Sequence, residues 1–247
     1  MRMRSWMLMA AIVAAPAAVV AKVTVSPAIT KALADPARAD QAQDDARRHA
    51  ADVLAFSGVK PGWTVIDYLP GKGYWSRILT NVVGSSGHVY ALWPQVAIKS
   101  YQGDIDALKG RGLANVTAEG QATNLPTVPQ PADLFWTVQN YHDLANFGGE
   151  AGYVAFNKAV FDALKPGGIY MVIDHVAPAG SGLADTKTLH RIDPAIVKKQ
   201  ILAAGFQWVG ESNALANPKD DHSLKVFDPT IRGVTDQFVY KFRKPLK

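Results

Sequence analysis

A strand, a glycine turn and the start of a helix follow one another in Val65-Ile66-Asp67-Tyr68-Leu69-Pro70-Gly71-Lys72-Gly73-Tyr74. The apolar residues before Asp67 predict a buried strand, and the residues after Gly73 begin an amphipathic helix. Glycines let the backbone approach a ligand closely, and a helix N-terminus offers free N–H donors to a polar or anionic group. The stretch therefore predicts a ligand site, although a tight turn without a ligand would explain two glycines equally well.

Strands and helices alternate along the chain on both sides of this turn. Trp75, Ile78 and Val82 share one helical face, and Asp193 and Pro194 have the residue types of a helix start. Strands are expected at 63–67, 89–92, 116–119, 134–138, 169–174, 208–213 and 238–242. Such alternation predicts an α/β domain with a largely parallel sheet covered by helices on both faces. Ligands bind such sheets beyond the carboxyl ends of the strands.

The composition bounds the class of protein. The chain has 247 residues, of which 48% are hydrophobic and 19% charged, which suits one globular domain. The formal net charge of +5 is scattered, so it does not indicate nucleic-acid binding. There is no cysteine, which excludes disulfides, iron–sulfur clusters and thiol nucleophiles.

The N-terminus has the succession of residue types found in a secretory signal peptide: positive charges, an apolar core and small residues. Arg2 and Arg4 precede an apolar stretch at 6–20 that is short for a membrane span. We expect cleavage after Ala21 and export to the bacterial periplasm; an uncleaved anchor is the alternative. Residues 22–34 are expected to be an irregular lead-in, followed by a helix at 36–56. The main domain is expected to span 57–247.

Four further motifs stand at matching distances from the glycine turn. They are Val59-Lys60-Pro61-Gly62, Gly87-His88-Val89-Tyr90-Ala91, Gly120-Gln121-Ala122-Thr123-Asn124-Leu125-Pro126 and Leu164-Lys165-Pro166-Gly167-Gly168. With them, the chain from about 53 to 206 resembles the class I S-adenosylmethionine (SAM)-dependent methyltransferases, especially a branch of predicted secreted methyltransferase-like proteins. The resemblance implies a Rossmann-like, doubly wound sheet of seven strands, mostly parallel, with an antiparallel last strand.

The resemblance also implies where SAM would bind. Asp67, Gly71, Gly73 and Tyr74 would lie along the methionine and ribose side, and Gln121 would accept a hydrogen bond from the adenine amino group. Gln139 is expected to complete this site.

The chain departs from the family pattern at two positions. Leu69 occupies the place of the family's first glycine, and Leu92-Trp93-Pro94 stands where an acidic residue usually binds the ribose hydroxyls. Trp93 would pack against the adenosine instead. These departures favour the alternative that the protein keeps the fold as an exported binding or stress-related protein without the chemistry.

Polar residues follow the fourth and fifth expected strands. His142 is the predicted general base, because imidazole titrates near neutral pH, and Tyr141 would orient the substrate or shield the sulfonium. His175 and His190 are expected to face the same crevice, with Arg191 pairing to Asp193 or to a substrate anion. Three histidines near an aspartate also suit a divalent ion, although no compact metal motif is present and no metal ligand is assigned.

The sequence thus predicts an exported SAM-dependent methyltransferase that acts on a small molecule. No nucleic-acid partner and no stable membrane insertion after cleavage are expected. The segment 217–222 is expected to be a charged loop, either a solvated turn or a lid over the cleft.

Overall fold

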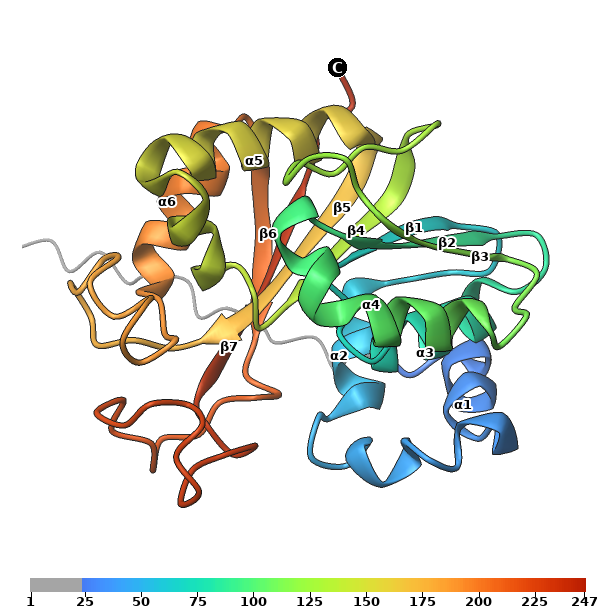
Figure 1. Ribbon diagram of the computed structural model, residues 1–247, viewed down its shortest axis with the longest axis horizontal. Helices are drawn as coiled ribbons and strands as arrows, with labels where there is room; N and C mark the ends of the chain where they lie inside the picture. Colours follow the sequence, from blue (N-terminus) through green and yellow to red (C-terminus); the bar gives the residue numbers. More distant parts are fainter. Residues whose placement is uncertain (1–23) are drawn as a thin grey trace, which may run out of the picture.

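The computed structural model describes residues 24–247, and one sheet organises them. The strands are β1 (Thr64–Tyr68), β2 (His88–Trp93), β3 (Val116–Gly120), β4 (Ala132–Val138), β5 (Leu164–His175), β6 (Gln207–Ser212) and β7 (Gln237–Arg243). Their order is β3-β2-β1-β4-β5-β7-β6 (Figure 1). Strands β1 to β5 pair in parallel, whereas β7 is antiparallel to both β5 and β6. The predicted mostly parallel seven-stranded sheet with an antiparallel last strand is confirmed.

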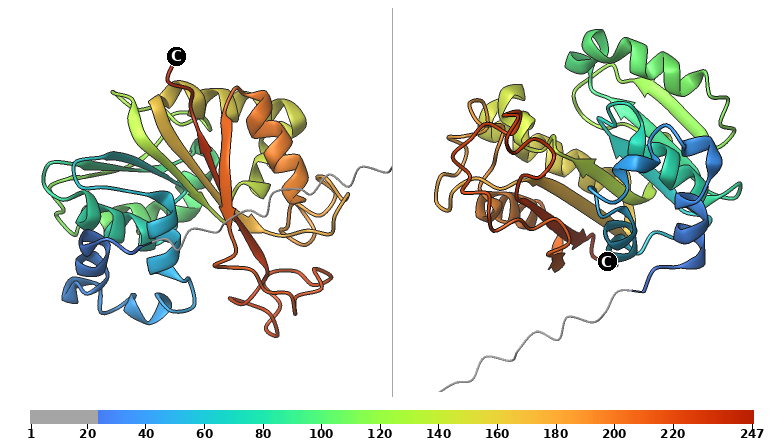
Figure 2. Two further views of the ribbon diagram at one scale, coloured as in Figure 1. Left: turned by 180° about the vertical axis from the view of Figure 1, so that it is seen from behind. Right: turned by 90° about the horizontal axis from the view of Figure 1, so that it is seen from below.

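Helices cover both faces of the sheet. They are α1 (Pro27–Leu33), α2 (Ala50–Ser57), α3 (Tyr74–Val83), α4 (Gln95–Lys109), α5 (Gly149–Ala163) and α6 (Pro194–Ala203). Successive strand residues point to opposite faces: Val65 and Trp136 pack with α1, α2 and α3, while Ile66 and Phe135 pack with α5 and α6. Figure 2 shows the N-terminal segment (residues 24–57, in blue) beside the first half of the sheet and the orange α6 beside the second half.

The carboxyl ends of the parallel strands meet at one edge of the sheet, which is where ligands bind in this architecture. Three segments start there: the glycine loop (69–73) after β1, the segment 139–144 after β4 and the segment 176–193 after β5. The loop 213–236 between β6 and β7 reaches the same edge and extends beyond the sheet in Figure 1. Four chain segments that are distant in sequence are therefore brought together.

The N-terminal segment differs from its prediction. The expected irregular lead-in contains α1, because the Ser26 side chain accepts a hydrogen bond from the Ile29 N–H and Pro27 begins the helix. The expected continuous helix at 36–56 is two 3₁₀ turns (Pro36–Arg38 and Ala42–Asp44) followed by α2. His49, with a left-handed backbone (φ 44°), separates these turns from α2.

Three further differences concern local structure. Helix α4 and a 3₁₀ helix at His142–Phe147 were not predicted. The motif Leu164-Lys165-Pro166-Gly167-Gly168 is the irregular start of β5, which was expected to begin only at 169, and the register with β4 shifts there. The predicted N-cap is confirmed, since the Asp193 side chain accepts a hydrogen bond from the Ala195 N–H.

The N-terminal signal peptide predicted at 1–21 lies outside the described residues. Within residues 24–247, no helix combines the length and the apolar character that crossing a bilayer requires.

Candidate active site

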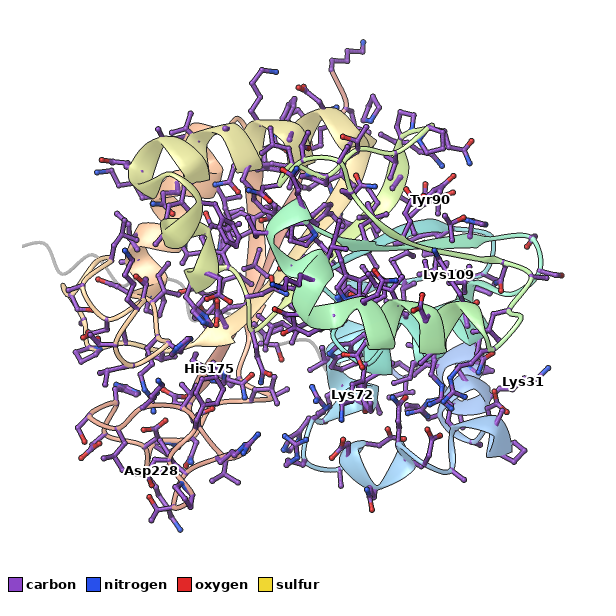
Figure 3. All side chains as sticks on the ribbon, in the orientation of Figure 1. Lys31, Lys72, Tyr90, Lys109, His175 and Asp228 are labelled. Atoms are coloured by element: carbon purple, nitrogen blue, oxygen red, sulfur yellow. The ribbon has the colours of Figure 1, made fainter. Side chains whose placement is uncertain are left out.

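A cavity of about 400 Å³ opens over the glycine loop at the carboxyl edge of the sheet. Its walls come from the glycine loop, from Gln139, Asn140 and Asp143 after β4, from Tyr101 of α4, and from the N-terminal segment. This volume falls within the range of about 300–1,000 Å³ that is typical of small-molecule sites. In Figure 3, Lys72 of the glycine loop and His175 at the end of β5 are both found toward this edge.

The glycine loop adopts left-handed backbone at three positions. Leu69, Gly71 and Gly73 have φ of 54°, 56° and 73°. A Cβ at Gly73 would meet Leu108 at 3.3 Å, whereas Gly71 faces open space. Leu69 adopts this conformation despite its side chain, which lines the cavity without closing it.

The side chain of Asn140 fixes the glycine loop to the end of β4. Its amide Nδ2 donates to the backbone carbonyls of Tyr68 at 3.1 Å and Leu69 at 3.4 Å, and its Oδ1 accepts from the Thr137 hydroxyl. Because Asn140 is buried, these bonds replace the water that the loop carbonyls would otherwise bind. These bonds fix the backbone conformation at the start of the glycine loop.

Asp67 lies at the floor of the cavity and is 2% exposed. Burial raises the pKa of Asp67 to about 7, and the hydrogen bond from the Ser76 hydroxyl at 2.6 Å offsets only part of that rise. Its carboxyl group is therefore poised to change charge near neutral pH, and a cationic ligand would favour the ionised form.

Tyr74 begins α3 and faces the N-terminal segment, as well as lining the cavity. Its hydroxyl donates to Asp45 at 2.7 Å, and the Arg48 guanidinium lies 4.5 Å from its ring centre. Asp40 pairs with Arg77 at 2.8 Å, which ties the same segment to α3. The N-terminal segment is thus part of the cavity wall.

Trp93 and Gln121, the two residues expected near the adenosine, do not line this cavity. Trp93 is fully buried against Ile105 and Leu108 of α4, so its ring forms core and does not line the cavity. Gln121 lines a separate depression after β3; its Oε1 accepts from the Thr127 N–H at 2.8 Å, and its Nε2 donates to Glu119 at 2.9 Å. Neither side chain is presented to the cavity in this structure.

Gln139 does line the cavity, with a left-handed backbone at φ 59°. Its Nε2 donates to Gln237 at 2.9 Å and its N–H donates to Ile173 at 2.7 Å. The expectation for Tyr141 is not met: its hydroxyl binds Asn157 and Gln200, and its ring packs in the core under α5. A side chain held there does not reach a substrate at the cavity.

A chain of polar groups runs from Asp174 to the surface. His142 Nδ1 lies 2.8 Å from the Asp174 carboxylate, and His142 Nε2 lies 3.3 Å from His190 Nδ1. His142 is 3% exposed and does not itself line the cavity, whereas Asp143, whose Oδ1 lies 3.5 Å from His142 Nε2, does. His190, with φ of 55°, remains partly exposed.

The environment separates the pKa values of these two imidazoles. Burial lowers the pKa of His142, but the charge and the hydrogen bond of Asp174 outweigh it, so the net shift is upward. Burial and the neighbouring His142 lower the pKa of His190. A proton shared by the pair therefore favours His142.

The donor atoms of His142, Asp143 and His190 lie within 4.8 Å of one another, a spacing that a small divalent ion also uses. Here the hydrogen bond between the two imidazoles accounts for the close approach.

His175 and Arg191 do not face the cavity. His175 Nδ1 lies 2.7 Å from the Thr235 hydroxyl, and burial lowers the pKa of His175 to about 4. Arg191 is fully buried and pairs with Asp220 at 2.9 Å, so the expected pairing with Asp193 or a substrate anion is wrong. The loop 217–222 is confirmed as a loop, but Asp220 anchors it in the interior.

Sequence reasoning missed several residues of the cavity wall. Four of them, Asp40, Gln41, Asp44 and Arg48, lie between the signal-peptide pattern and the first family motif. Tyr101 lies on the unpredicted α4, so no local pattern marked any of the five. Asn140 and Asp143 lie within the polar stretch after β4, which was singled out without roles for them. Their positions depend on how distant segments meet.

Comparisons with known proteins identify the fold. No family model and no curated protein matches the chain. Solved structures do match, and the sheet order with the antiparallel seventh strand is that of the Rossmann-like methyltransferase fold.

One of these is a SAM-dependent methyltransferase from Aquifex aeolicus, with a TM-score of 0.56 and 21% identity, covering 87% of this chain and 96% of that chain. A second is the glycopeptide N-methyltransferase MtfA complexed with sinefungin, with a TM-score of 0.55 and 13% identity over 81% and 87% of the two chains. A third is the 4+2 cyclase SpnF, with a TM-score of 0.56 and 18% identity over 84% and 82%. At these identities the likeness establishes the fold.

Proposed function

We propose that the protein is a methyltransferase that uses SAM to methylate a small molecule. The observation that carries the proposal is the cavity of about 400 Å³ between the glycine loop and the end of β4, at the carboxyl edge of the sheet. Support comes from structures of the same fold, including one that holds sinefungin, an analogue of SAM. SAM would supply a methyl group on a positively charged sulfur.

The residues of the cavity suit such a cofactor. Gly71 leaves open space where a Cβ would project, so the backbone can be approached closely. Asp67 provides a buried carboxyl group that a cation would stabilise in its ionised form. Polar wall atoms without hydrogen-bond partners, Gln41 Oε1 and Arg48 Nε, remain for a ligand to satisfy.

The histidine pair supplies a route for the proton of the nucleophile. In the tautomer that this route needs, His142 donates its Nδ1–H to Asp174, and its Nε2 accepts a hydrogen bond from His190 Nδ1–H. Nε2 of His190 is then the nitrogen that accepts a proton from the nucleophile. Transfer of a proton to His190 and onward to His142 places the positive charge beside Asp174. In this proposal His142 is the final base, His190 carries the proton, and Asp174 is a positioning residue.

Titration calorimetry with SAM and S-adenosylhomocysteine tests cofactor binding. We expect both to bind the chain expressed without residues 1–21, and no heat at millimolar ligand would contradict the proposal. For His142→Gln, which keeps a donor toward Asp174 but has no basic nitrogen, we expect almost unchanged cofactor affinity and loss of turnover. Persisting turnover on any compound that the wild type methylates would exclude His142 as the base.

The second candidate is an exported binding protein without methyl transfer. Trp93 favours it, because this apolar ring is buried where the family usually places a ribose-binding carboxylate. Binding of S-adenosylhomocysteine without turnover across phenols, amines and carboxylic acids would support this candidate.

Export is proposed from residues 1–21 alone. N-terminal sequencing of the protein expressed with its full leader is expected to begin at Lys22. A chain that begins at Met1 would contradict a cleaved signal.

A further inference from the structure

We propose that the N-terminal segment recognises the α-amino-acid end of the ligand, with Arg48 and Trp75 donating to its carboxylate and Gln41 accepting from its ammonium group. The inference rests on the proposed function, because SAM is the ligand that would bring this group to the cavity. The residues that would recognise the amino-acid end of SAM thus lie outside the glycine motif.

Unpaired buried atoms locate the site. Within residues 24–247, three buried side-chain atoms that lack a hydrogen-bond partner belong to residues lining this cavity: Gln41 Oε1, Arg48 Nε and Trp75 Nε1. Buried polar atoms are nearly always paired in folded proteins. Eight such atoms occur within residues 24–247, and these three are the ones whose residues surround a cavity at the ligand-binding edge of the sheet, where a ligand can complete the pairing.

Arg48 stands apart from the arginines around it. Arg38 pairs with Asp45, Arg47 with Asp44, and Arg77 with Asp40. Arg48 makes no salt bridge within the described part of the chain and is instead stacked 4.5 Å from the ring centre of Tyr74. Its guanidinium is held in place without a carboxylate partner, which a ligand carboxylate would supply.

The three unpaired atoms match the two ends of a zwitterion in kind. Arg48 Nε and Trp75 Nε1 are donors that suit a carboxylate, and Gln41 Oε1 is an acceptor that suits an ammonium group. Asp40 and Asp44 lie in the same wall and add negative charge for the ammonium. A ligand that lacks the amino-acid end would leave these atoms unpaired, so the site discriminates against it.

The segment is positioned firmly enough for this role. Gln41 Nε2 donates to the Lys72 carbonyl at 3.3 Å, linking the segment to the glycine loop. Asp40 contacts both guanidinium nitrogens of Arg77 at 2.8 Å, and Tyr74 holds Asp45 at 2.7 Å. These contacts set the wall before a ligand arrives, which reduces the cost of binding.

The test compares two ligands that differ in the amino-acid end. S-adenosylhomocysteine carries it, and 5′-methylthioadenosine does not. By calorimetry on the chain from residue 22 to 247, we expect the wild type to bind the first at least about 30-fold more tightly. In Arg48→Met, affinity for S-adenosylhomocysteine should fall about 10- to 100-fold while affinity for 5′-methylthioadenosine stays within about twofold.

Arg47→Met is the matched control, since Arg47 is adjacent, exposed and paired with Asp44; both affinities should stay within about twofold. Equal binding of the two ligands by the wild type, or an unchanged preference in Arg48→Met, would overturn the inference. If the wild type binds neither ligand, the proposed function itself is wrong and this inference is wrong with it. If Arg48→Met does not fold, the same two affinities are measured in Trp75→Phe. An unchanged preference for S-adenosylhomocysteine over 5′-methylthioadenosine in that variant also overturns the inference.

Discussion

The two halves of the carboxyl edge differ in how their polar groups are paired. Around the glycine loop, Gln41 and Arg48 keep buried atoms without partners beside an open cavity. Around the histidines, the charged side chains satisfy one another: His142 binds Asp174, and Arg191 binds Asp220 together with two backbone carbonyls. The first half has the features of a site completed by a ligand, and the second those of a network fixed in advance.

This difference separates binding from chemistry. A residue whose partner is a ligand affects affinity, whereas a residue inside a completed network affects the orientation of other residues and the stability of the fold. Substitutions in the two halves should therefore change different measurements.

The largest expected effect comes from Asp174→Asn in the histidine network. The amide can donate to His142 Nδ1 and so select the other tautomer, which turns Nε2 from an acceptor into a donor. The same substitution in a Ser-His-Asp triad lowers turnover by about 10⁴-fold because it selects the wrong tautomer. Turnover should fall by about that much, with affinity for S-adenosylhomocysteine nearly unchanged.

Nitrogen-15 NMR of the His142 ring provides a readout that needs no substrate. It should report a proton on Nδ1 in the wild type and on Nε2 in Asp174→Asn. Full turnover in the variant would show that the network does not take part in proton removal.

The next effect concerns the loop 213–236. Arg191 and Asp220 are almost fully buried, and removing one partner of such a pair costs about 3–5 kcal/mol because the other charge is left alone. Arg191→Met should therefore lower the free energy of unfolding by roughly that amount in urea denaturation. Arg232→Met, an exposed residue of the same loop, should change it by less than about 0.5 kcal/mol. Equal effects of both would show that the buried pair does not anchor the loop.

Asp67 connects stability to pH on the glycine-loop side. Its pKa is about 7 in the folded protein and about 3.9 in an unfolded chain, so the folded state binds this proton more tightly. The stabilising contribution is complete below about pH 4 and is lost as pH rises toward 7. Relative to Asp67→Asn, the wild type should lose up to about 4 kcal/mol of unfolding free energy between pH 4 and pH 8.

Urea denaturation of both proteins across that range measures the difference. A difference that does not change with pH would mean that Asp67 keeps an ordinary pKa in the folded protein.

The sequence predicted the fold well because the fold depends on periodicity. All seven strands match the runs expected from the sequence, and the central strands β1, β2, β4 and β5 bury most of their side chains. For the N-terminal segment, periodicity predicted the wrong structure. Its turns are set by two side-chain contacts, the Asp35 cap on the Ala37 N–H and the ion pair of Arg38 with Asp45, and such contacts leave no periodic pattern in the sequence.

Apart from Gln139 after β4, the cavity residues that were predicted come from one local motif. Asp67, Gly71, Gly73 and Tyr74 lie at the cavity because a single strand–turn–helix stretch positions them. Arg48 reaches the same cavity through the packing of the N-terminal segment on α3, which no local pattern encodes. Trp93 and Tyr141 stand next to motif positions but point into the core, because a strand or turn residue can face either side.

The smallest expected effect is at Leu69, where a branched side chain adopts φ of 54° and lines the cavity. Leu69→Gly suits this conformation and removes the side chain from the wall, so S-adenosylhomocysteine should bind about two- to threefold more tightly, which corresponds to roughly half a kcal/mol. Leu69→Ala is the control, because it keeps a Cβ on the left-handed backbone and should gain less. Calorimetry of the three proteins compares them directly. Weaker binding by Leu69→Gly would show that Leu69 contacts the ligand, and the leucine would then be a binding residue instead of an obstacle at the glycine-loop side of the edge.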